Sequence, residues 1–146
     1  VCSSDLIEIG PHQPFELAGV QFSAVHTQHT VPTLGFILKS QTGCLAFAGD
    51  TKNIDSVLEL AGALQINLDH VIAEVSMSNA CEELAITTGH LTPRMIESQI
   101  QELSKNVTVW LGFLKEWQRL KIEAEMRHIQ ADCAVRMMER DWVFEF

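Results

Sequence analysis

Three short stretches of the sequence each place a metal-capable side chain just after a predicted strand. They are HTQHTVPTLGF, FAGDTKN and TTGHLTP, which contain His29, Asp50 and His90. Imidazole nitrogens and carboxylate oxygens are ligands for zinc and similar divalent ions, and one aspartate can bridge two metals. Because the loops that follow strands in α/β folds converge on one edge of the sheet, we expect these side chains to share a site.

Each of these residues also has a structural interpretation. An isolated histidine is usually structural or solvated, so His29 alone is weak support for a metal. Asp50 in GDT could cap a helix or form a turn, and His90 could hydrogen-bond a backbone carbonyl. His90 does precede a Thr-Pro helix start, however, and helix N-termini attract phosphate groups. The separations along the chain are long, so spacing alone leaves the metal site open.

The elements that must position these side chains alternate between strands and helices. Alternation and β-branched residues predict one strand from Phe15 to about Thr27, and then two strands joined by a turn at Gln41–Gly43. The second of these two, Cys44–Ala48, is continuously apolar, as a strand covered on both faces would be. NIDSVLELAGAL has the spacing of a helix face, with Asn53 as its N-cap.

The second part of the chain continues this alternation. We expect a buried strand from His70 to Val75, a polar segment SMSNACEELAITTGHLTP with no assigned element, and a helix that opens at Thr92 with Pro93 in its first turn. VTVWLGF predicts a further strand and EWQRLKIEAEMRHI a further helix. AVRMM, ERD and WVFEF predict a terminal hairpin. The alternation indicates an α/β layered domain.

The composition limits what the protein can bind. The chain has 146 residues, enough for one domain with one core, and a formal net charge of −9. This acidity argues against a broad nucleic-acid surface, which needs clustered Lys and Arg. No apolar run approaches the roughly 20 residues that a membrane helix needs, so we expect no membrane partner. Cys44, Cys81 and Cys133 form no CxxC pair, which favours reduced thiols.

The ordered series HTVPTLGFIL, GCLAFAGDT, IAEVS and GHLTP resembles the C-terminal half of metallo-β-lactamase-fold hydrolases. It is most similar to class II 3′,5′-cyclic-nucleotide phosphodiesterases, and tRNase Z is a related family. The resemblance covers roughly Phe15 to Phe146. GDT alone is common, but the ordered combination is far more specific. The resemblance implies the C-terminal half of an αββα sandwich and two divalent metal ions, zinc in the first place, with manganese or iron as alternatives.

The resemblance also implies roles for individual residues. His29 matches the histidine that completes one metal site, Asp50 the aspartate that bridges the two metals, and His90 the histidine of the second metal. Glu74 matches an acidic residue at a strand end, either behind the ligands or handling a proton. Asp50, Glu74 and His90 are therefore the expected catalytic groups.

Other residues near these positions are assigned lesser roles. Thr51 and Thr92 are expected to support the metals, and His26 to orient its loop without ligating. A buried carboxylate needs a partner, and for Glu74 a histidine of a missing N-terminal half is one candidate. Three histidines carry no functional signal: His12, His70 and His128.

The sequence departs from the family pattern in two ways. The leading HxHxDH motif, which supplies most of the metal ligands, is absent, and relatives often carry a histidine near Phe113, followed by Lys115. The opening VCSSDL is the translation of the tail of a common sequencing adapter. We therefore expect residues 1–6 to be foreign, residues 7–146 to be the C-terminal part of a single metallohydrolase domain, and an N-terminal part to be missing.

The expected function is hydrolysis of 3′,5′-cyclic nucleotides, cAMP or cGMP, to 5′-nucleotides, with the present chain inactive by itself. The expected partner is thus a small molecule, and exposed strands could also pair two copies into a homodimer. One alternative is another hydrolase of the fold, such as tRNase Z or an arylsulfatase-like enzyme; a second is a non-catalytic binding relative. Cytoplasmic and periplasmic locations both remain open.

Overall fold

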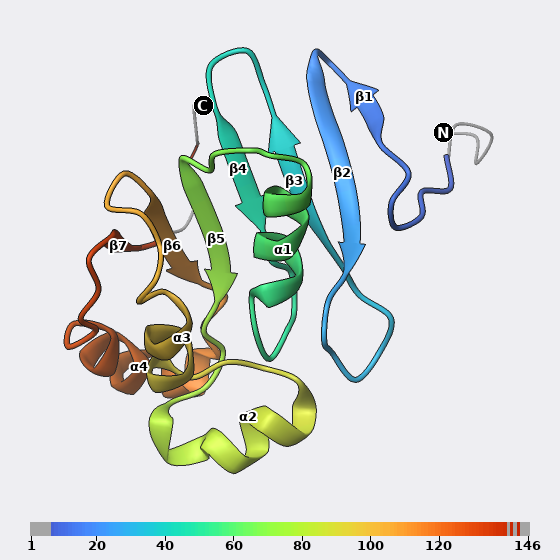
Figure 1. Ribbon diagram of the computed structural model, residues 1–146. Helices are drawn as coiled ribbons and strands as arrows, with labels where there is room; N and C mark the ends of the chain where they lie inside the picture. Colours follow the sequence, from blue (N-terminus) through green and yellow to red (C-terminus); the bar gives the residue numbers. More distant parts are fainter. Residues whose placement is uncertain (1–6, 140, 142, 144–146) are drawn as a thin grey trace.

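The strands form one sheet in which each strand pairs with its neighbours in the chain (Figure 1). The computed structural model describes residues 7–139, 141 and 143. From β1 to β4 the pairs are antiparallel, and from β4 to β7 they are parallel. The strands are β1 (Phe15–Leu17), β2 (Val20–His26), β3 (Leu34–Lys39), β4 (Cys44–Phe47), β5 (His70–Glu74), β6 (Thr108–Gly112) and β7 (Ala134–Met137).

The helices connect the parallel strands. The α-helices are α1 (Asp55–Ala63), α2 (Glu82–Thr88), α3 (Pro93–Gln99) and α4 (Arg119–Met126), and short 3₁₀ turns η2 (Asn79–Cys81) and η3 (Glu116–Gln118) precede α2 and α4. Crossovers between parallel strands are right-handed, and the parallel strands follow one another in a single direction across the sheet. These connections therefore bring α1, α3 and α4 to the same face of the sheet.

The main hydrophobic core lies between that face and the helices. Val57 of α1, Ile96 of α3 and Ile122 of α4 are buried against inward-facing residues of β5 and β6 such as Val71 and Val109. Burying side chains of this size stabilises a fold by about 1.5–3 kcal/mol each. The core thus fixes the ends of β4 and β5, from which the candidate site is built.

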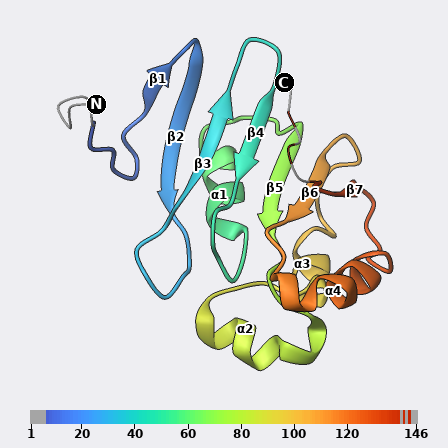
Figure 2. The same ribbon diagram turned by 180° about the vertical axis from the view of Figure 1, so that it is seen from behind.

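The opposite face of the sheet is also apolar, but no described helix crosses it (Figure 2). One cross-strand row runs through Phe36, Phe47, Ile72 and Trp110. A groove of about 340 Å³ lies beside it, with this lining: Ile9, Phe15, Leu17, Phe22, Phe36, Leu38, Leu45 and Phe47. We call this surface the open face. Strands that are apolar on both sides are those buried on both sides.

The single strand predicted from Phe15 to Thr27 is wrong, because it is a hairpin of β1 and β2. Ala18 and Gly19 form the turn, with φ of 52° and 80°. Two consecutive residues with positive φ make the mirror-image turn whose twist matches that of antiparallel strands. Sequence periodicity missed the turn because Ala is not a residue that usually adopts positive φ.

Two helix starts also differ from the prediction. The first helix begins at Asp55 with Ile54 as its N-cap, and Asn53 lies one residue earlier. The Asn53 side chain still accepts a hydrogen bond from the Asp55 N–H, at 3.3 Å. The last helix begins at Arg119, after η3. The start of α3 is confirmed: Thr92 is its N-cap, and its side chain accepts from the Met95 N–H.

The polar segment left without an element contains α2, which sequence periodicity missed. Two acidic residues, Glu82 and Glu83, open this helix, and Gly89 ends it in the left-handed conformation. These are ordinary start and stop signals. The helix shows no strong apolar stripe, because Ala85 is its only buried residue among those described.

The predicted terminal hairpin is found in part. AVRMM does form a strand, β7, which pairs in parallel with β6. The predicted partner strand WVFEF includes residues 142 and 144–146, which lie outside the described residues, so the terminal hairpin stays a prediction.

Cys44, Cys81 and Cys133 are free thiols, as expected. Within the described residues, no helix has the length and apolar character needed to cross a membrane.

Candidate metal centre

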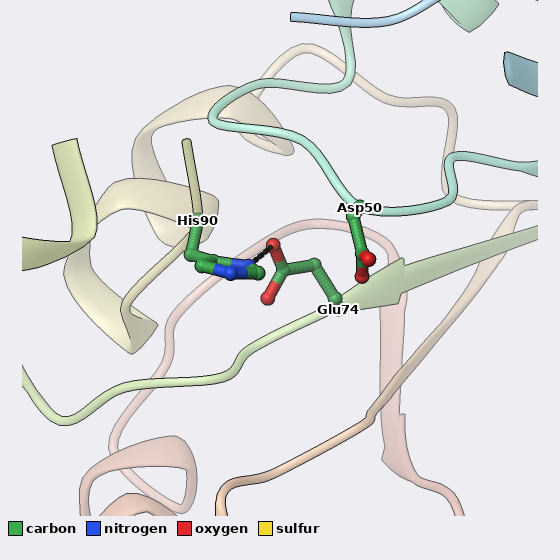
Figure 3. A group of neighbouring side chains, drawn as sticks. All are labelled: Asp50, Glu74 and His90. Atoms are coloured by element: carbon green, nitrogen blue, oxygen red, sulfur yellow. Dashed lines mark hydrogen bonds and ion pairs between the residues drawn. The ribbon is translucent and has the colours of Figure 1, made fainter. Parts of the chain in front are cut away.

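Asp50, Glu74 and His90 come together at the carboxyl-terminal edge of the parallel strands (Figure 3). Asp50 lies in the loop after β4, Glu74 is the last residue of β5, and His90 follows α2. One potential ligand atom from each lies within 4.8 Å of the other two. Strand ends in open α/β sheets are where such loops converge, and the structure brings Asp50 and His90 together there with Glu74. The roles of these residues stay predictions.

Glu74 is the buried anchor of this group, with a side chain only 1% exposed. One oxygen accepts from the Thr51 N–H at 3.4 Å and lies 2.7 Å from Nδ1 of His90. The other accepts from the Ser76 N–H at 3.0 Å and from the Ser76 hydroxyl. A buried carboxylate needs such partners. The histidine partner of Glu74 is His90 of this chain, whereas a histidine of a missing N-terminal half was one candidate from the sequence.

This pairing sets what His90 can do. A carboxylate oxygen accepts from an imidazole N–H, so Nδ1 of His90 is the donor and Nε2 is the ring nitrogen left for a ligand. Histidines that bind metals usually donate their other ring N–H to a carboxylate or carbonyl in this way. The hydrogen bonds to Glu74 use its acceptor sites, which leaves Nε2 of His90 as the atom of this pair that could bind a metal. The role of His90 as a metal ligand stays a prediction.

Asp50 supplies the complementary oxygen. Its side chain is exposed, and the described residues offer its carboxylate no hydrogen bond; only its backbone carbonyl is used, by the Thr27 hydroxyl at 3.1 Å. A free carboxylate beside an oriented imidazole suits a divalent cation such as zinc or manganese. A tetrahedral site needs four ligands, so the described residues provide only part of a centre.

His29 lies beside this group rather than within it. Its Nδ1 is 2.9 Å from the Gly89 carbonyl, and its ring centre is 4.9 Å from that of His90. As Nδ1 donates to the carbonyl, Nε2 is left as the free nitrogen. Its predicted role, completing one of the two metal sites, therefore stays a prediction.

Gly89 is a site residue that sequence reasoning missed. A Cβ at this position would lie 2.8 Å from Nδ1 of His29, and its φ is +75°. Only glycine tolerates both the contact and the conformation. A Gly-His pair directly after a helix is the signal that could have revealed it.

The two predicted threonine supports have different roles. Thr51 is buried, donates its N–H to Glu74 and bonds the Asn53 carbonyl through its hydroxyl at 2.7 Å. Thr92 is buried too, but it caps α3. His26 ends β2 with an exposed side chain. Its ring makes no hydrogen bond within the described part of the chain.

Phe113 is the residue near which the resemblance led us to expect a histidine. Its φ is +60°, and its carbonyl accepts from the Ser76 hydroxyl at 3.3 Å. Its ring lies edge-on to Phe47, 6.1 Å between centres, and so extends the open face. Ser76, which links Phe113 to Glu74, is a second site residue that the sequence did not reveal.

A hollow of about 370 Å³ adjoins the group on the side of His29. It is lined by Gln28, His29, Thr30, Lys52, Ile86, Thr87 and Gly89. The hollow thus lies between the loop after β2, the loop after β4 and the end of α2. We call it the His29 hollow.

The sequence and the fold of this chain are similar to those of known proteins. A family model described as a beta-lactamase superfamily domain matches residues 2–113. Among solved structures, the metallo-beta-lactamase fold protein YhfI from Bacillus subtilis matches with a TM-score of 0.72 at 16% identity, over 95% of this chain and 55% of that one. The short form of human tRNase Z matches with a TM-score of 0.56 at 22% identity, over 71% of this chain and 39% of that one. No curated protein matches the chain.

These matches confirm the expected fold class. At such low identities the likeness concerns the fold, and the chain spans about half the length of YhfI and less of tRNase Z. One sheet with helices on a single face corresponds to one half of a two-sheet sandwich.

Proposed function

Because the chain belongs to the beta-lactamase superfamily, we propose that it is part of a metal-dependent phosphodiesterase that hydrolyses 3′,5′-cyclic nucleotides to 5′-nucleotides. The observation that carries the proposal is the His90 imidazole, held by buried Glu74 beside the free carboxylate of Asp50. This is the donor arrangement of a hydrolytic metal centre.

The residues have separate tasks in this reaction. Asp50 and His90 would hold divalent metal, with His29 beside them. Metal bound there supplies Lewis acidity toward phosphoryl oxygens and lowers the pKa of water. Glu74 accepts from Nδ1 of His90 and orients the ring, so that Nε2 is the nitrogen left for metal. Thr51 and Ser76 hold the Glu74 carboxylate in place through their N–H groups.

A small cyclic nucleotide suits this site better than a nucleic acid does. The His29 hollow, at about 370 Å³, lies within the roughly 300–1,000 Å³ of small-molecule pockets. The net charge of −9 would repel an RNA substrate, which counts against an activity like that of tRNase Z. The resemblance of HTVPTLGF and GHLTP to cyclic-nucleotide phosphodiesterases adds the substrate class.

The test is to extend the chain at its N-terminus with a family segment that carries HxHxDH. With zinc or manganese, the extended protein should hydrolyse cAMP or cGMP, while the 146-residue chain should not. Asp50→Ala should abolish the activity; Asp55→Ala, in the first turn of α1, is the matched control. Precursor tRNA and an aryl sulfate serve as rival substrates.

The outcomes separate the hypotheses. Cleavage of precursor tRNA or aryl sulfate without cleavage of cyclic nucleotides would replace our proposal with another hydrolase of the fold. Failure of the extended, folded protein to bind metal, measured by elemental analysis, would favour a non-catalytic binding relative.

A further inference from the structure

The His29 hollow contains a single permanent cation, Lys52. Apart from His29, none of its other lining residues is titratable. The ion pairs among the described residues use His90, Arg94 and Arg119 as cations, so Lys52 has no carboxylate partner there. No described lysine takes part in these ion pairs, and Lys52 is the lysine that lines the His29 hollow.

The backbone of Lys52 is fixed at the edge of the metal group. Its N–H donates to the Gln28 carbonyl at 3.0 Å, and its own carbonyl accepts from the Gln99 side chain at 3.4 Å. The preceding residue, Thr51, donates to Glu74. Asp50 and Lys52 therefore flank a residue that is tied to the buried carboxylate.

The two loops that border the hollow are joined to each other. The Gln28 carbonyl also accepts from the Thr51 hydroxyl, at 3.4 Å, and the Gln28 N–H donates to the same hydroxyl at 3.2 Å. The hollow therefore has a fixed backbone frame, which lowers the ordering cost of binding a ligand.

We propose that the His29 hollow is a phosphate subsite and that Lys52 is the residue that binds the phosphoryl anion. A lysine ammonium is a compact charge that commonly binds phosphate. The side chains of Gln28 and Thr30 line the same hollow and offer further polar groups. Ile86, 52% exposed, gives an apolar wall for the organic part of an ester.

The subsite deepens the proposed function and rests on it for its substrate, but anion binding itself does not require metal. Phosphate held at Lys52 would share the hollow with His29, whose ring centre is 4.9 Å from that of His90. The same chemistry could serve free phosphate or the phosphodiester of a cyclic nucleotide, so the test uses both.

The experiment is a titration of the ¹⁵N-labelled chain, freed of metal with EDTA, followed by amide shifts in NMR spectra. Inorganic phosphate and cAMP are the probes; adenosine and acetate at matched ionic strength are the controls. We expect saturable shifts at Thr30, Lys52 and Gly89 with the two phosphates, weakening as salt rises. Lys52→Met should weaken binding about tenfold, and Lys52→Arg should largely restore it.

Lys105→Met is the matched control, because Lys105 is also exposed but lies in the loop before β6. It should bind phosphate as the unchanged chain does. Equal binding by Lys52→Met, or shifts confined to other residues, would overturn the subsite. So would equal shifts with acetate, which would indicate general anion attraction.

In the extended protein the two proposals fail in different ways. Phosphate binding that depends on Lys52, without hydrolysis of cyclic nucleotides, would retain the subsite and reject the activity. Hydrolysis with an unchanged KM for Lys52→Met would do the reverse. The expected result is a KM for cAMP raised about tenfold.

Discussion

Gly89 shows how one residue can couple a helix end to a candidate site. It ends α2 in the left-handed conformation, and its carbonyl lies 2.9 Å from Nδ1 of His29. Its missing side chain leaves room for the His29 ring. A substitution here therefore strains the backbone and displaces a site histidine together.

We expect Gly89→Ala to lower the free energy of unfolding by about 1–3 kcal/mol, because the added Cβ clashes and φ is +75°. Urea denaturation measures the change. Gly62→Ala in α1 is the matched control, since nothing lies within 4 Å of its added Cβ. It should stabilise the protein by about 0.5–1 kcal/mol. Equal effects of the two changes would contradict this account.

Glu74→Gln should weaken the hydrogen bond that fixes a proton on Nδ1 of His90, and it leaves the shape of the side chain unchanged. The amide can still accept from Nδ1 with its oxygen, but its NH₂ group would then face donors at Ser76. We expect the ¹⁵N imidazole shifts of His90 to change from the Nδ1–H tautomer toward a mixture. Metal affinity in the extended protein should fall about 10–100-fold. Glu102→Gln, at an exposed position, should change neither.

At the scale of elements, local sequence signals predicted the strands from β3 to β7 and the start of α3, but not that the strands from β4 to β7 pair in parallel. They failed where a conformation is unusual for its residue, as at Ala18, or where a helix lacks an apolar stripe, as in α2. In the candidate site, Asp50 and His90 were found through their residue types and motifs. Ser76 and Gly89 were not, because their roles depend on backbone contacts between segments distant in the chain.

The turn between β1 and β2 offers a test of local strain. Asn-Gly is the preferred pair for this turn, and Ala18 now occupies its first position with φ of 52°. Ala18→Asn should therefore raise the free energy of unfolding by about 0.5–1 kcal/mol, as measured in urea. Gly19→Ala, at φ of 80°, should lower it. A loss of stability in Ala18→Asn would disprove the strain argument.

Cys133, the residue directly before β7, is expected to make the stability of the protein depend on pH. Burial raises the pKa of its thiol, so the unfolded thiol ionises first as pH rises. The contribution of Cys133 to stability is complete below the ordinary pKa of 9.0 and is lost as pH rises toward the folded value. Urea unfolding at neutral and alkaline pH should show a smaller loss in Cys133→Ala than in the unchanged chain. An equal loss would assign the effect to other groups.

At the scale of the whole molecule, the open face combines buried residues, Ile72 and Trp110, with an apolar groove in which Leu17 is 64% exposed. Helices cover one side of the sheet, while the row from Phe36 to Trp110 lies on the other. In a two-sheet sandwich, a second sheet packs about 10 Å away against such a surface. The fold class thus explains why strands of this chain are apolar on both faces.

We expect the 146-residue chain to enhance the fluorescence of the dye ANS, and the extended protein to lose most of this enhancement. Leu17→Lys, which puts a charge in the groove of the open face, should weaken dye binding. Leu64→Lys is the matched control, because exposed Leu64 lies at the end of α1 and does not line that groove. Equal dye binding by the chain and the extended protein would show that the open face is not covered.

The order of the strands has a consequence for how the protein is made. Each described strand pairs with the one synthesised just before it, so no later strand must insert between two earlier ones. The sheet can therefore lengthen strand by strand as the chain leaves the ribosome. Asp50, Glu74 and His90 all precede β6. The residues of the candidate metal centre have thus been synthesised, and lie at the growing edge of the sheet, before the last two described strands are translated.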